Sequence, residues 1–139
     1  MRRLLIVMSL LAACAACGSD TPTTPTTSSA PYSQTDLVIG TGAVVNNGNR
    51  ATVIYTGWLY DTSRTDGKGA QFDSRAGFNF VVGAGQVIAG WDRGVPGMRI
   101  GGQRRLIIPP ELAYGSQSPS PLIPPNATLV FDITLTGVS

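Results

Sequence analysis

The segment GAGQVIAGWDRGVPGM, which spans residues 83–98, carries the pattern that decides the fold. Glycines bound this segment on both sides, so it has room for only two or three helical turns. Helices this short are marginal in water unless an apolar face packs on another element. Its apolar residues recur at the spacing of one helical face: Val87, Ile88, Trp91 and Val95. We therefore predict a short helix whose Trp91 meets a β-sheet formed by the rest of the chain.

Two simpler interpretations apply to this segment when it is taken alone. It is explained as an ordinary core helix with a buried tryptophan. Gly83 and Gly85 also begin the G-x-G pattern of a dinucleotide-binding loop. The third glycine of that fingerprint would fall at Ile88, so the dinucleotide pattern fails.

The remainder of the chain predicts β-structure. Alternating or β-rich runs predict strands at residues 51–60, 78–82, 104–108 and 128–135, with a further edge segment at 71–74. Glycine-rich and proline-rich stretches between these runs predict turns and loops, including a projecting loop at residues 61–70. We predict an α+β fold in which a twisted antiparallel β-sheet of about five strands wraps around one short α-helix.

The first residues predict an export signal with a lipid anchor. A basic start, MRR, precedes an apolar run at residues 4–13 that is too short to span a membrane. The sequence LAAC, which ends at Cys14, matches the bacterial lipobox, in which the cysteine is lipidated and becomes the new N-terminus. Cys17 is the alternative lipidated residue, although the lipobox prefers leucine at the position that Cys14 would then occupy. A secreted protein with two incidental cysteines is the remaining alternative.

The N-terminal region therefore divides into three parts. We predict a lipoprotein signal peptide at residues 1–13, a lipidated N-terminus with a Thr/Ser/Pro-rich tether at 14–31, and the folded domain at 32–139. The tether has too few apolar residues to bury the surface that folding requires. We expect the protein in the bacterial cell envelope, lipid-anchored and either periplasm-facing or surface-exposed.

Composition excludes several classes of function. The chain has 10 basic and 8 acidic residues, and removal of Arg2 and Arg3 with the signal peptide leaves these counts equal. No basic stripe is visible, so we expect no nucleic-acid partner. The chain contains no histidine, which excludes Ser-His-Asp catalysis and zinc sites built on histidine. The acidic residues lack calcium-loop spacing, so we expect no metal.

Separated motifs together point to one family. They are VIYTG at residues 53–57, FDS at 72–74, VIAGW at 87–91 and LAYG at 112–115, followed by IPPNATLVFD at 123–132. In this order and spacing they resemble the FKBP-type peptidyl-prolyl cis-trans isomerases, here in a bacterial lipoprotein form. The resemblance covers essentially the whole predicted domain.

This resemblance implies an aromatic pocket between the sheet and the helix. Trp91 would form its floor, and the Ile88 backbone N–H and the Tyr114 hydroxyl would donate to substrate carbonyls. Gln86 would contact substrate through its backbone carbonyl. The implied catalytic residues are Tyr55, Asp73, Trp91, Tyr114 and Phe131. The implied substrate-binding residues are Phe72, Phe78, Gln86, Val87, Ile88, Leu122 and Ile123, the last two over the pocket rim. Without the resemblance, Tyr55, Phe78 and Phe131 are each explained as plain core residues.

The resemblance also implies a function. The chain would accelerate rotation of X–Pro bonds in envelope or secreted proteins, without a cofactor. Its partners would be proline-containing polypeptides, macrolide inhibitors of the rapamycin type and, through the lipid anchor, the membrane; we expect a monomer. One alternative is a chaperone module that holds proline-containing segments with little turnover. Another is an envelope lipoprotein that has kept the fold and lost the activity, which the complete set of pocket residues disfavours.

Overall fold

The computed structural model describes residues 29–139. The predicted signal peptide, Cys14, Cys17 and most of the predicted tether lie outside the described residues. Among residues 29–139, no helix has the length and apolar character needed to cross a membrane. The first strand begins at Ser33, directly after the start that the sequence predicts for the folded domain.

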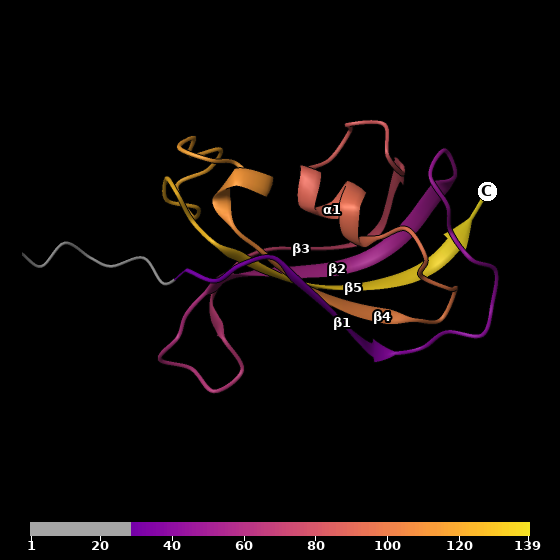
Figure 1. The fold of residues 1–139 in the computed structure, drawn as a ribbon, viewed down its shortest axis with the longest axis horizontal. Coiled ribbons are helices and arrows are strands. Elements are labelled where there is room, and N and C mark those ends of the chain that lie inside the picture. Colours follow the sequence, from indigo (N-terminus) through magenta and orange to yellow (C-terminus); the bar gives the residue numbers. More distant parts are fainter. Residues whose placement is uncertain (1–28) are drawn as a thin grey trace, which may run out of the picture.

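Five strands form one antiparallel sheet, and the helix lies over one of its faces (Figure 1). Along the chain the elements are β1 (Ser33–Val38), β2 (Arg50–Tyr60), β3 (Lys68–Val81), α1 (Ala89–Gly94), β4 (Gln103–Ile108), the 3₁₀ turn η1 (Pro110–Leu112) and β5 (Leu129–Val138). The strand order across the sheet is β1-β4-β5-β2-β3, and all pairings are antiparallel. The predicted α+β class, a sheet around one short helix, is confirmed.

The helix-facing side of the sheet carries the hydrophobic core. Side chains alternate between the two faces of a strand, so every second residue of β5 points toward the helix. Those residues are at most 3% exposed: Leu129, Phe131, Ile133 and Leu135. In β2, Val53 and Tyr55 are buried on the same side, while Ile54 between them is 45% exposed. Both alternations agree with the pattern in the sequence, except that Val130 of β5 is also buried, at 1% exposed.

The helix is shorter than predicted. It begins at Ala89, so Val87 and Ile88 precede it instead of sharing its apolar face with Trp91. Ile88 has an extended backbone (φ −60°, ψ 152°) and occupies the N-cap position. The periodicity was misleading because Val87 and Ile88 line the same pocket as Trp91 although they lie before the helix begins.

The third strand is longer than predicted. Residues 71–74 and 78–82 were expected as separate strands after a loop ending at residue 70, but β3 runs without a break from Lys68 to Val81. Val53 pairs with Phe78 whereas Tyr55 pairs with Arg75, so β3 holds one extra residue opposite β2. Gly77 lies in this bulge with φ +73°. Because a bulge absorbs residues without ending the strand, the polar stretch that separated the two predictions stays in the sheet.

Glycines let the helix lie close to β4. A Cβ atom on Gly90 would lie 2.5 Å from the Ile108 side chain, and one on Gly94 would lie 2.6 Å from Leu106. The guanidinium of Arg104, also in β4, donates a 2.7 Å hydrogen bond to the Gly94 carbonyl at the end of the helix. These contacts set the position of α1, and therefore of Trp91, against the sheet.

Candidate active site

A pocket of about 180 Å³ lies between the start of the helix and the sheet. A water molecule occupies about 30 Å³ of liquid, so the pocket accepts a small organic group. Its lining residues come from β2, β3, β5, α1 and two connecting segments: Tyr55, Phe72, Asp73, Phe78, Gln86, Val87, Ile88, Trp91, Tyr114 and Phe131. The structure thus brings together all the residues predicted for the site except Leu122 and Ile123.

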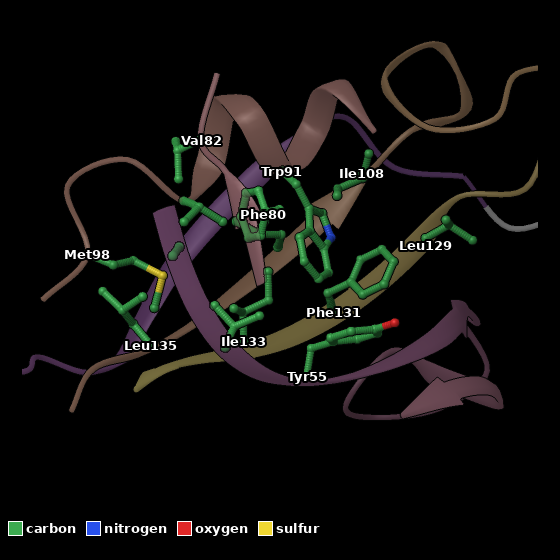
Figure 2. Close-up of a cluster of buried hydrophobic side chains, with 14 of the residues drawn as sticks. Tyr55, Phe80, Val82, Trp91, Met98, Ile108, Leu129, Phe131, Ile133 and Leu135 are labelled. Atoms are coloured by element: carbon green, nitrogen blue, oxygen red, sulfur yellow. The ribbon is translucent and has the colours of Figure 1, made fainter. Parts of the chain in front are cut away.

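Aromatic rings meeting edge to face form the floor and walls. Tyr55 and Trp91 have ring centroids 4.9 Å apart with planes at 84°, and Trp91 and Phe131 lie 5.3 Å apart at 89°. Figure 2 shows these three side chains converging from β2, α1 and β5. Phe72 continues the wall, 5.5 Å from Phe131, and Phe78 lies 5.8 Å from Tyr55. Such edge-to-face pairs are favourable arrangements, so the rings form a rigid apolar surface.

Asp73 is held at the pocket by two hydrogen bonds. Its Oδ2 accepts a 2.5 Å bond from the Tyr55 hydroxyl, and its Oδ1 accepts a 2.9 Å bond from the Ser74 backbone N–H. Burial raises the pKa of Tyr55 well above its usual value, and the hydrogen bond to the Asp73 carboxylate raises it further. Tyr55 therefore remains a neutral donor that fixes the carboxylate beside the pocket.

Tyr114 provides a second hydroxyl from the loop after η1. The loop is fixed beside it, because Gly115 donates to the Pro110 carbonyl and accepts from the Asn126 N–H, both at 2.8 Å. The Tyr114 side chain is 36% exposed, and its hydroxyl makes no hydrogen bond to another residue of the described chain. Burial, followed by the nearby Asp73 carboxylate, raises the pKa of Tyr114. This hydroxyl is thus a neutral donor available to a ligand.

The segment before the helix supplies a backbone donor. The Ile88 carbonyl accepts hydrogen bonds from the N–H groups of Trp91 at 2.9 Å and Asp92 at 3.3 Å, whereas the Ile88 N–H has no partner in residues 29–139. The Gln86 side-chain oxygen is already used within the protein, because Oε1 accepts a 2.9 Å hydrogen bond from the Val81 N–H. A role for Gln86 in binding would therefore use its backbone, as the sequence comparison with the family implied.

Leu122 and Ile123 do not line the pocket. Ile123 is 6% exposed and belongs to the core cluster, whereas Leu122 is 58% exposed. Ser118 Oγ donates to the Ile123 carbonyl at 2.7 Å, and Ser120 Oγ accepts from the Leu122 N–H at 3.0 Å. These short-range bonds fold the loop into a turn that directs Ile123 inward and Leu122 outward.

Every lining residue was predicted, but one residue that is hydrogen-bonded to the turn before the pocket segment was not. Asp92, in the first turn of α1, accepts two backbone hydrogen bonds from the turn at residues 83–85. An acidic residue at the start of a helix is common, because it complements the helix dipole. The sequence therefore contained no signal that would separate Asp92 from an ordinary helix-capping residue.

The chain matches known proteins throughout this domain. Residues 42–136 match the family described as FKBP-type peptidyl-prolyl cis-trans isomerase. An FK506-binding protein of Neisseria meningitidis serogroup A is 43% identical over 103 residues, covering 74% of this chain and 92% of the relative. The structure of FkpA from Escherichia coli superposes with a TM-score of 0.65 and 36% identity, covering 82% of this chain and 51% of that one.

The fold and pocket therefore define a peptidyl-prolyl isomerase domain of the FKBP type. The chain belongs to the FKBP-type peptidyl-prolyl cis-trans isomerase family. Some relatives are much longer. The chain is 47% identical over 100 residues to FK506-binding protein 4 of Dictyostelium discoideum but spans only 26% of its length.

Proposed function

We propose that this chain accelerates cis–trans rotation of X–Pro bonds in proline-containing polypeptides of the cell envelope or of secreted proteins. The observation that carries the proposal is the apolar aromatic pocket with two uncommitted donors, the Ile88 N–H and the Tyr114 hydroxyl. The family supports the reaction type, and the pocket supports a substrate with one apolar ring and flanking carbonyl groups.

The barrier to rotation is amide resonance, roughly 18–20 kcal/mol, and uncatalysed exchange takes tens to hundreds of seconds. Turnover about a thousand times per second requires lowering this barrier by roughly 6–7 kcal/mol. The planar amide is more charge-separated than the twisted one, so an apolar pocket disfavours the planar forms relative to the transition state. Trp91 and Phe131 supply the apolar surface, and the two donors hold the flanking chain in a turn. No proton transfer is required.

Exchange spectroscopy on a short Leu-Pro peptide tests this proposal. We expect residues 32–139 to raise the cis–trans exchange rate of the peptide in proportion to enzyme concentration. Binding of the peptide without faster exchange would instead support the chaperone module that holds proline segments. A macrolide of the rapamycin type should compete with the peptide, because relatives of this chain are named for binding FK506.

We expect activity with one peptide to be flat from about pH 6 to 8.5. Carboxylates ordinarily titrate near 4 and tyrosines near 10. The pKa values of Tyr55 and Tyr114 are both raised, so both hydroxyls stay protonated across this range and beyond its upper end. The measurement is kcat/KM at constant ionic strength. A bell-shaped profile centred near pH 7 that disappears in Asp73→Asn would indicate a proton-transfer step and contradict the mechanism.

We further propose that the mature chain is a monomer anchored in the cell envelope by lipid on Cys14. The support for the anchor is the LAAC sequence after a short apolar run. Cys14→Ser should abolish membrane association in a fractionated cell, whereas Cys17→Ser should leave it intact. Mass spectrometry that finds the lipid on Cys17 would reverse the assignment, and an unlipidated product would remove the anchor.

A further inference from the structure

We propose that Asp92 is a positioning residue that holds the donor segment of the pocket, residues 86–88, in its binding geometry. Asp92 lies outside the pocket lining, but its carboxylate is bonded to the turn that leads into this segment. The inference rests on the proposed function, because it concerns how the Ile88 N–H is presented to a substrate.

Two hydrogen bonds attach the turn to the helix. Asp92 Oδ1 accepts from the Gly83 N–H and Oδ2 accepts from the Gly85 N–H, each at 2.9 Å. Both carboxylate oxygens are therefore used, and hydrogen bonds to a charged acceptor are stronger than those between neutral groups. Gly83 and Gly85 adopt φ values of +81° and +74°, which glycine reaches at little cost. Glycine thus makes this turn conformation accessible, and the two bonds to the Asp92 carboxylate favour it over others.

Asp92 is also hydrogen-bonded, through its backbone, to the last residue of the segment. The Asp92 backbone N–H donates to the Ile88 carbonyl at 3.3 Å, and Asp92 directly follows Trp91, the pocket floor. Residues 83–88 therefore form a loop whose two ends are both bonded to Asp92. Gln86 adds a fourth bond, because its Oε1 accepts from the Val81 N–H at 2.9 Å. The loop carries Val87 and Ile88, two of the residues that line the pocket.

This arrangement predicts an effect on binding more than on turnover. If the turn is released, only a fraction of molecules presents the Ile88 N–H correctly, and the apparent affinity falls by that fraction. Ground state and transition state share this contact with the flanking chain, so KM should rise while kcat changes little. A purely structural role would instead lower the melting temperature and the active fraction, with KM unchanged.

The test uses the full chain and the variants Asp92→Asn, Asp92→Glu and Asp61→Asn. In Asp92→Asn, one oxygen is replaced by an NH₂ group that cannot accept from a glycine N–H. We expect hydrogen exchange at Gly83 and Gly85 to accelerate several-fold, and KM and the Kd for a Leu-Pro peptide to rise about fivefold to tenfold. Asp92→Glu keeps both acceptors and should recover part of the affinity. Asp61, which accepts two hydrogen bonds from Ser63 in an exposed loop, is the matched control and should leave KM unchanged.

Faster amide exchange in Asp92→Asn with unchanged KM and Kd would overturn the inference while leaving the isomerase function in place. An increase in KM no larger than that of Asp61→Asn would overturn it as well. If the parent chain binds the peptide but has no isomerase activity, the proposed function fails, and the Kd values of the variants still decide the role of Asp92.

Discussion

Phe131→Ala should destabilise the domain by about 3–5 kcal/mol and lower kcat/KM at least about tenfold. Phe131 is 3% exposed, and its ring contacts those of Tyr55, Phe72 and Trp91. Its removal leaves a cavity beside the core and removes one wall of the pocket. Stability is measured by urea unfolding, and kcat/KM is measured at a low temperature at which the variant is fully folded.

Ile133→Ala is the matched control for this prediction. Ile133 lies two residues further along β5, is fully buried on the same face and does not line the pocket. Its truncation should cost about 2–5 kcal/mol of stability but leave kcat/KM of the folded protein close to that of the parent. Full activity in a folded Phe131→Ala variant would show that the pocket has been placed wrongly.

Gly90→Val should reduce the free energy of unfolding by about 3 kcal/mol, at the upper end of typical overpacking costs. A Cβ at this position would meet three Ile108 side-chain atoms at 2.5–2.8 Å, and Ile108 is fully buried and has no room to move. Helix propensity by itself would make valine more stable than glycine in a helix, by several tenths of a kcal/mol. A loss of stability would therefore report the contact between α1 and β4. Activity should fall too, because displacement of the helix moves Trp91.

Gly137→Ala serves as the control for this second prediction. A Cβ on Gly137 would meet its nearest atom, in Thr52, at 3.5 Å, which is ordinary van der Waals contact. We expect the free energy of unfolding, measured in urea, to change by less than about 1 kcal/mol for this variant. If Gly90→Val is as stable as Gly137→Ala, the helix is not seated on β4 as the structure shows.

Periodic burial explains why much of the fold was predictable. The alternation through β5 follows from the two-residue repeat of a strand and needs no knowledge of its neighbours. The aromatic residues of the site were predicted because the separated motifs matched one family, although Tyr55, Phe78 and Phe131 taken singly were explained as core. The structure shows that both descriptions hold for Tyr55 and Phe131, which are buried in the core cluster and also line the pocket.

The sequence by itself determined the sheet, the presence of one short helix and the residues that line the pocket, because these depend on local pattern and on motifs. Tertiary structure alone decided where the helix begins. Val87 and Ile88 follow a turn whose backbone is hydrogen-bonded to the Asp92 side chain, several residues further along the chain. Tertiary structure also decided that β3 is continuous and that Ile123 turns into the core. Each of these outcomes depends on hydrogen bonds or strand pairing that a local pattern does not encode.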